Sequence, residues 1–454
     1  MPMTRLEPDI RQLPAASPGL TLTAALLGFA LITLDASIVN VALPSVGAAL
    51  GGGMSGLQWV VDAYTLAFAA LMLSTGAFSD RVGASRAFGI GIALFTLASA
   101  ACGLAPNLPA LIGARAVQGV AAAVVLPASL ALVRQAYPDP ARRARAVASW
   151  GAGGSVALAL GPVAGGALTI GWDWRGIFFI NLPLGAVALA LLVRAPRSER
   201  RPAPLDLPGQ LTAMVTLTAL AFAVIEGGAT GLVALAVAVL AALAFLRIEA
   251  RQAHPVVPLG LFRDRTVSVA VAAGMSVSTA FYGVVFVFSL FFQQVQGRSA
   301  LYAGLMFLPM SGLIGVTNVL SGKLTARYGA RLPMLIGQGL AATGLLLLLY
   351  VDAGTSPVLV AVLLVPMALG CALAVPPLTS AMMDAVPGER AGLAAGVFNA
   401  ARQVAGGLSV AVFGVLVTDG FEPGMRRGLA ISAGLLLVTG LLSFRLSGPS
   451  ASRA

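Results

Sequence analysis

Long apolar runs, separated by short stretches of charge, glycine or proline, constrain this chain more than any other feature. A membrane-spanning helix needs about 20 mostly apolar residues, and runs of this kind recur from residue 20 to residue 445. Only 10% of the residues are charged and 58% are hydrophobic, whereas soluble domains carry about 25% charged residues. We therefore predict an all-α polytopic membrane protein with no large soluble catalytic domain.

Fourteen runs are long enough to be predicted as transmembrane helices. Their approximate bounds are 20–44, 57–78, 87–105, 108–133, 146–170, 176–194, 208–226, 229–246, 267–293, 301–321, 333–351, 357–380, 393–417 and 428–445. The seventh and eighth runs are joined by only Gly227 and Gly228. This short connection predicts a tight helical hairpin and keeps the topology even.

The basic residues predict how the helices are oriented. The formal net charge is +11, but the basic residues collect in loops and are not interleaved with aromatics on a soluble module, so we expect no nucleic-acid partner. With a cytoplasmic N-terminus, 22 of the 28 Lys and Arg residues fall in inside segments and four in outside loops. The positive-inside rule therefore predicts that both termini are cytoplasmic.

An internal repeat predicts two related halves. Residues 76–86 and 322–331 share the pattern Gly-x-x-x-x-Arg-x-Gly-Ala, and each follows the second helix of a six-helix block. Two such blocks related by an axis along the membrane normal are a transporter architecture. A polar, Pro-rich stretch over 195–206 is typical of a linker. We predict an N-terminal bundle over 1–195, a linker with the inserted hairpin over 196–262, and a C-terminal bundle over 263–454.

Three charged residues within the predicted helices are candidates for proton coupling. Charges inside a bilayer are energetically expensive and need a partner or a water path. Asp35 lies in the first helix and Arg115 in the fourth. A carboxylate beside a guanidinium is either a proton relay or a static ion pair, and we favour the relay because static pairs stabilise little. Asp62, in the second helix, is either a second proton site or a hydrated residue near the surface.

Two glycine-containing motifs predict moving parts. The segment of Gly76, Asp80, Arg81, Gly83 and Arg86 is typical of a turn that can act as a breakable latch between bundles, or of a plain loop. The fifth helix contains Gly161, Pro162, Gly165 and Gly166. Gly161 and Gly165 share a helix face that permits close approach, and Pro162 permits a bend. Ordinary small-residue packing is the alternative.

A substrate cavity is expected between the two halves. The residues that we expect to line it are Asn40, Tyr64, Gln118, Tyr282, Phe286, Gln293 and Arg402. For the aromatic residues of the ninth helix, contact with lipid is the alternative, and for Arg402 it is a structural role. A metal site is not expected, since His254 is the single histidine. Lys323, the single lysine, is followed by Leu324, so a Walker A motif is absent from the sequence.

These residues resemble a known family. The halves, the Gly76–Arg86 segment, Arg115-x-x-Gln118-Gly119 and the Gly161–Gly166 string resemble the major facilitator superfamily, and the last string resembles its antiporter motif. The segments 34–44, 59–64 and 172–181 resemble the fourteen-helix drug:proton antiporters, most closely the bacterial antibiotic-export branch that includes methylenomycin-resistance proteins. The sequence departs from the pattern at Ser85-Arg86, where the family has two basic residues, and at Ala326, which replaces the acid in the second copy.

The resemblance implies a monomeric bacterial cytoplasmic-membrane protein that exports a small hydrophobic or amphipathic drug-like compound. It implies that Asp35 and Arg115 take part in proton coupling, that the Gly76–Arg86 segment controls the conformational switch, and that the proton gradient replaces any cofactor. A dedicated exporter of one native metabolite, such as an antibiotic, amino acid or siderophore, is the first alternative. A non-transporting membrane sensor is the second. An enzyme is not expected.

Overall fold

The computed structural model describes residues 17–193, 198, 200, 206–252, 255, 257–387 and 391–444, and these residues form helices and no strands. The first half contains α1 (Pro18–Leu50), α2 (Gly53–Val82), α3 (Ala84–Gly103), α4 (Leu108–Ala136), α5 (Pro140–Gly171), α6 (Gly176–Phe179) and α7 (Asn181–Leu192). The middle contains α8 (Leu207–Glu226) and α9 (Gly228–Glu249). The second half contains η1 (Leu259–Arg263), α10 (Arg265–Leu290), η2 (Phe291–Val295), α11 (Ala300–Met306), α12 (Leu308–Tyr328), α13 (Arg331–Leu348), α14 (Pro357–Asp384), α15 (Ala391–Thr418) and α16 (Phe421–Phe444).

The all-α membrane fold is confirmed. In the described part of the chain, 12 helices are long and apolar enough to cross a bilayer, and the bent helix α2 raises the count to 13. The expected sixth span corresponds to a shorter apolar helix over Gly176–Leu192. Helices are the form that such apolar segments adopt because every backbone N–H and C=O must be hydrogen-bonded within the segment when no water is present. The count of fourteen spans stays a prediction.

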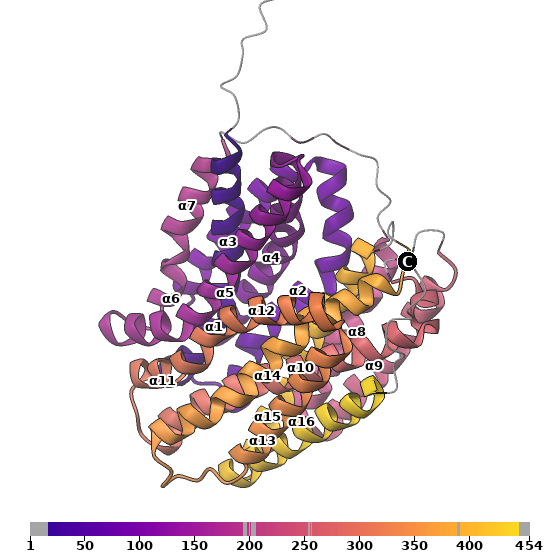
Figure 1. The fold of residues 1–454 in the computed structure, drawn as a ribbon. Helices are drawn as coiled ribbons and strands as arrows, with labels where there is room; N and C mark the ends of the chain where they lie inside the picture. Colours follow the sequence, from indigo (N-terminus) through magenta and orange to yellow (C-terminus); the bar gives the residue numbers. More distant parts are fainter. Residues whose placement is uncertain are drawn as a thin grey trace, which may run out of the picture.

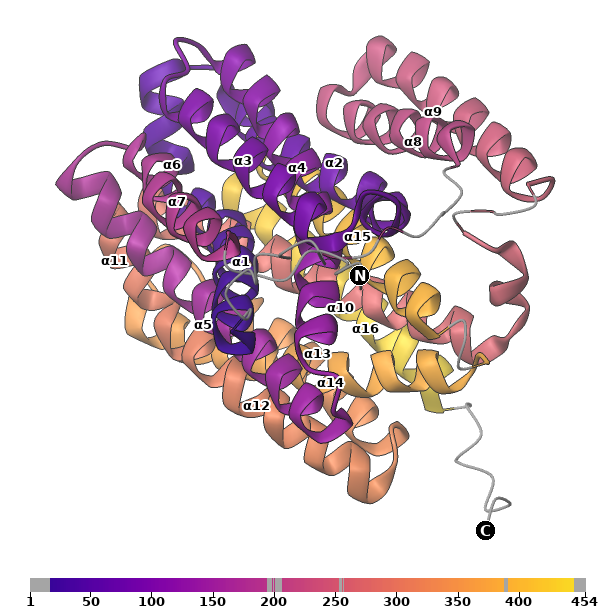
Figure 2. The same cartoon turned by 90° about the horizontal axis from the view of Figure 1, so that it is seen from above.

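The helices form two bundles with a hairpin at the side (Figure 1). In the first bundle α1 packs against α5 and α7, and α2 against α4; in the second, α10 packs against α15 and α16, and α13 against α14. The hairpin of α8 and α9 lies at the edge, where α8 contacts both α2 and α15 (Figure 2). The predicted linker over 195–206 and His254 fall almost wholly outside the described residues.

Hydrogen bonds attach the hairpin to α2 near both ends of α8. The Gln210 side chain donates to the Ala70 carbonyl over 2.5 Å. At the other end, Glu226 accepts hydrogen bonds from Ser55 Oγ over 2.8 Å and from Trp59 Nε1 over 3.3 Å. Glu226 is exposed, so a charge at this helix end remains accessible to water while it holds the hairpin.

The bundles are joined at the face where α1 ends. Ser289 Oγ donates to the Asn40 carbonyl over 2.7 Å, and Gln293 Nε2 donates to the Val41 carbonyl over 3.0 Å. The side chain of Gln58, near the start of α2, donates to a carbonyl of α15 over 2.5 Å. These contacts all involve the latter part of α1 or the first part of α2, so the two bundles are joined at this end.

Candidate functional site

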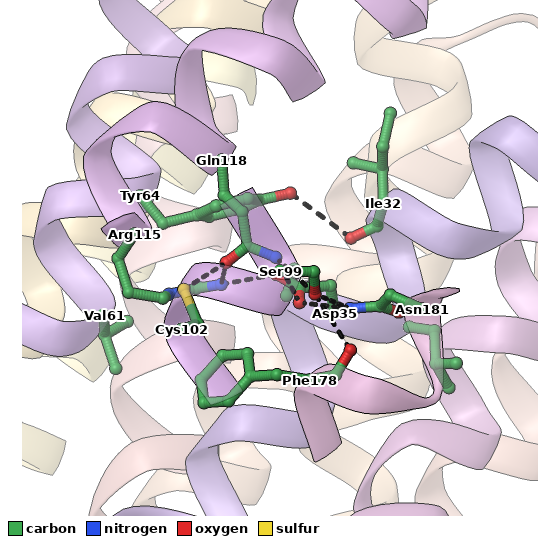
Figure 3. A network of polar contacts seen from close by, with 12 residues as sticks. Ile32, Asp35, Val61, Tyr64, Ser99, Cys102, Arg115, Gln118, Phe178 and Asn181 are labelled. Atoms are coloured by element: carbon green, nitrogen blue, oxygen red, sulfur yellow. Dashed lines mark hydrogen bonds and ion pairs between the residues drawn. The ribbon is translucent and has the colours of Figure 1, made fainter. Parts of the chain in front are cut away.

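A buried ion pair lies at the centre of the first bundle. Arg115 Nη1 of α4 donates to Asp35 Oδ2 of α1 over 2.5 Å. The side chains are 1% and 0% exposed, respectively. The structure therefore brings together the acid and the base that were predicted to be partners from two separate apolar runs. Figure 3 shows the pair within a continuous network of polar contacts.

Two side-chain amides donate hydrogen bonds to the other oxygen of the Asp35 carboxylate. Its Oδ1 accepts hydrogen bonds from Asn181 Nδ2 over 2.9 Å and from Gln118 Nε2 over 3.2 Å. Both amides also donate to Ser99 Oγ, which itself donates to the Phe178 carbonyl. Sequence reasoning did not assign Asn181 or Ser99 to the site. In the sequence, each of the two is only an isolated polar residue within an apolar run. Many buried serines and asparagines without a functional role look the same.

The Arg115 guanidinium has further partners on α2. Its Nε donates to the Val60 carbonyl over 3.1 Å, and its Cζ atom lies 4.3 Å from the centroid of the Tyr64 ring. Nη1 also donates to Gln118 Oε1 over 2.8 Å. The network around the ion pair thus joins residues of α1, α2, α3, α4 and α7: Asp35 bonds to α4 and α7, and its partners bond to α2 and α3.

Asp62 lies apart from this network. It is fully buried, and neither of its carboxylate oxygens has a hydrogen-bond partner among the described residues. Across the bundle interface it faces Gly407 of α15, where an added Cβ would stand 3.6 Å from Asp62 Oδ1. Asp62 is therefore buried at the junction of the two bundles. It is not the hydrated residue near the surface that the sequence left as an alternative.

The Gly76–Arg86 segment is almost entirely helical, unlike the expected loop. Gly76, Asp80 and Arg81 lie in α2, Arg86 lies in α3, and Gly83 is the single residue between these helices. Gly83 has a φ of 91°, a value that favours glycine. In the second copy of the pattern, Gly329 takes the place of Gly83: it lies between α12 and α13 and has a φ of 77°. The repeated pattern thus corresponds to a repeated glycine turn between two helices.

The charged residues of this segment face water. Asp80, Arg81 and Arg86 are exposed, and no ion pair in the described part of the chain includes any of them. They lie at the face where α1 begins, opposite the end at which the bundles are joined. Their role as a latch stays a prediction.

The glycine string of α5 lies in two tight seams. Added Cβ atoms at Gly161 and Gly165 would collide with Ser37 and Ile38 of α1, and one at Gly166 would stand 2.6 Å from the Ala300 carbonyl oxygen of the other bundle. Pro162 lies inside the helix at the same level. The string thus allows close packing both within the first bundle and between the bundles.

A cavity of about 270 Å³ lies between the bundles. The first bundle contributes Phe29 and Thr33 of α1 and Ser155 of α5, and the second contributes Tyr282 of α10 and Arg402 of α15. Tyr282 and Arg402 are the predicted residues that line this cavity.

The other predicted cavity residues lie elsewhere, because each is held by a specific packing contact. Tyr64 and Gln118 contact Arg115. Asn40 bonds within its own helix to the Ala36 carbonyl, and Gln293 bonds to α1 at the end where the bundles are joined. Phe286 is 0% exposed in the core. For these residues the expected place in the central cavity is corrected. No three described His, Cys, Asp or Glu side chains gather as a metal site requires.

Two helical bundles, a cavity between them and a buried ion pair in one of them define a secondary membrane transporter. The family model of the Major Facilitator Superfamily matches residues 25–410, and the chain belongs to this family. The protein is accordingly a transporter and not an enzyme.

Several characterised proteins are similar over most of the chain. The multidrug resistance protein Stp of Mycobacterium tuberculosis is 41% identical over 90% of this chain and 78% of its own length. The methylenomycin A resistance protein of Streptomyces coelicolor is 35% identical over 96% and 92%, respectively. Among solved structures, the xylose transporter XylE of E. coli has a TM-score of 0.67 at 14% identity, covering 96% of this chain and 99% of that one. This last likeness concerns the fold alone.

Proposed function

We propose that this protein is a proton-coupled antiporter that exports small hydrophobic or amphipathic drug-like compounds. The observation that carries the proposal is the Asp35–Arg115 ion pair, which is buried inside a membrane-spanning bundle. A charge pair of this kind is rare in a bilayer and typically marks an ion pathway. The printed names of the relatives, multidrug resistance and methylenomycin A resistance proteins, support the substrate class.

The charge distribution supports the membrane orientation that we propose. With both termini in the cytoplasm of a bacterial cell, most Lys and Arg residues face inward. The bundles are joined at the face where α1 ends, which is then the outer face. This conformation is therefore inward-facing, and the cavity is filled from the cytoplasm or the inner leaflet. The transporter acts as a monomer and uses the proton gradient without a further cofactor.

Protonation of Asp35 is the coupling step. The neutral carboxyl loses its ionic attraction to Arg115 and can no longer accept all the hydrogen bonds that Arg115, Gln118 and Asn181 donate. Because these donors belong to different helices, the proton changes the packing of α1 against α4 and α7. That change favours one orientation of the bundles over the other, and release of the proton restores the ion pair.

Asp62 is the second proton carrier in this scheme. An ionised carboxylate without a partner is costly to bury, and Asp62 lies between α2 and α15 with both oxygens unpaired among the described side chains. We assign it a proton while the outer face is closed. When α2 and α15 separate in the outward-facing form, water reaches the carboxyl and the proton can exchange.

The test is a proton-flux assay in inverted membrane vesicles. An inside-acid gradient is imposed, a panel of dyes and antibiotics is added, and wild type is compared with Asp35→Asn. We expect at least one compound to release protons through the wild-type protein and not through the variant. If compounds bind and none releases protons, the antiport proposal is wrong and a facilitator or a sensor is the better account.

A further inference from the structure

Two arginines of the membrane-spanning bundles, one fully buried and one on the cavity wall, differ in their counter-ions. Arg115 is 2.5 Å from the Asp35 carboxylate. Arg402, on the cavity wall, has no carboxylate within ion-pair distance in the described part of the chain. Its Nε donates to Ser278 Oγ over 3.2 Å, and its Cζ atom lies 5.7 Å from the Phe398 ring centroid. A guanidinium has five N–H donors, and in the described part of the chain Nε is the Arg402 donor with a protein acceptor.

The cavity around Arg402 contains no compensating negative charge. The described residues that line it include no Asp, Glu, Lys or His, so Arg402 supplies the charge of the site. The remaining polar groups are hydroxyl, amide and thiol groups, contributed by Thr33, Ser155, Ser278, Tyr282, Asn318 and Cys371. Tyr282 donates to Gln403 over 3.3 Å and so does not turn its hydroxyl hydrogen toward a ligand.

An uncompensated cation in this position requires an explanation. Charges within membrane-spanning segments face a water-filled cavity or pair with one another, and they mark substrate and ion pathways. Asp35 is already occupied by Arg115, and Asp62 lies near Gly407 at the bundle junction. Arg402 instead faces the cavity, where a bound ligand can supply the negative charge.

We propose that the central cavity takes a compact amphiphile with an anionic head, and that the head pairs with Arg402. This inference rests on the proposed export function and specifies its substrate class. A carboxylate or another planar, delocalised anion fits best, because the guanidinium fork offers two parallel N–H donors to such a group. Cationic amphiphiles are disfavoured at the same site, since they would meet a like charge on the cavity wall.

The walls of the cavity select the body of the ligand. Phe29 and Phe281 provide aromatic surface on opposite bundles, and Leu158, Val277 and Ile314 provide aliphatic surface. The volume of about 270 Å³ is slightly below the usual range for small-molecule sites. A ligand with one aromatic ring, or two fused rings, and a single acidic group matches this size and chemistry.

Binding to the purified full-length chain in nanodiscs tests the charge assignment without requiring transport. The probes are 2-naphthoic acid and 2-naphthylmethylamine, which share a ring system and carry opposite charges, and calorimetry gives their affinities. We expect naphthoate to bind about ten- to a hundredfold more tightly than the amine, as charge-assisted hydrogen bonds to the guanidinium imply. Arg402→Gln should remove this preference, and Arg402→Lys should retain part of it.

Arg298→Gln is the matched control, because Arg298 is exposed outside the cavity near Tyr302. It should bind both probes as wild type does. If Arg402→Gln does not fold, the wild-type preference and the Arg402→Lys affinities still decide the question.

The outcomes separate this inference from the export function. Equal binding of both probes, or tighter binding of the amine, overturns the anion assignment. A wild-type protein that releases protons on adding cationic compounds and does not bind naphthoate refutes the substrate class and leaves antiport standing. A protein that binds naphthoate through Arg402 without proton release supports the site and refutes the coupling.

Discussion

Replacing Asp35 with Asn should destabilise the protein as well as uncouple it. Asp35 Oδ2 accepts from Arg115, while Oδ1 accepts from Gln118 and Asn181. An Asn side chain has one oxygen, so its NH₂ group must face either the guanidinium or the two amides, donor against donor. Removing one partner of a buried ion pair costs about 3–5 kcal/mol. We expect the free energy of unfolding to fall by that amount.

A double-mutant cycle separates the two roles of the pair. Arg115→Gln removes the cation that Asp35→Asn leaves unpaired, so the double variant should recover about 2–3 kcal/mol of stability relative to additive losses. Proton coupling should stay lost in both Asp35→Asn and the double variant. Asp173→Asn is the control, because the Asp173–Arg175 pair is partly exposed, at 44% and 35%, and such pairs contribute at most about 1 kcal/mol.

Denaturant unfolding in micelles, followed by the fluorescence of the four tryptophans, measures stability, and vesicle proton flux measures coupling. The reasoning fails if Asp35→Asn is as stable as Asp173→Asn, since the buried pair would then have no more effect than a surface pair. It also fails if the single variant still exchanges protons for substrate, because Asp35 would then not carry the proton.

Further predictions concern the bundle junction and the energetics. Asp62→Asn resembles the protonated acid, so stability should change by less than about 1 kcal/mol while fewer protons move per substrate; a stability loss like that of Asp35→Asn would contradict the proposed neutral state. Gly166→Ala should hold α5 away from Leu301, so that a thiol reagent added outside reaches the buried cysteines faster. Gly171→Ala, where the added methyl group meets open space, should not change this labelling. Equal labelling of the two variants would contradict the tight packing at Gly166. If Arg402 selects anions, proton entry and anion exit both move net positive charge inward. A potential negative on the cytoplasmic side should then favour export, with a driving free energy of about 2.3 kcal/mol per charge per 100 mV. An export rate that does not respond to a potassium diffusion potential would argue against this charge movement.

The sequence alone determined the class of the protein and predicted its buried ion pair. An apolar run of bilayer length is expected to form a helix, because a helix satisfies all its backbone hydrogen bonds internally. Each predicted run corresponds to a helix or a broken helix pair in the described chain. Asp35 and Arg115 stood out because a charge within an apolar run is costly wherever the helix packs. The repeat also predicted a turn, and Gly83 and Gly329 adopt it with φ values of 91° and 77°.

The tertiary structure decided which faces of these helices meet. The hydrophobicity of a membrane helix is nearly uniform around its axis, so the sequence does not say which side contacts a partner, lipid or the cavity. Packing therefore placed Gln118 beside Arg115 instead of in the cavity, and brought Asn181 and Ser99 into the network from distant segments. It likewise left Arg402 on the cavity wall without a carboxylate among the described residues, because pairing depends on distances across bundles that no local pattern encodes.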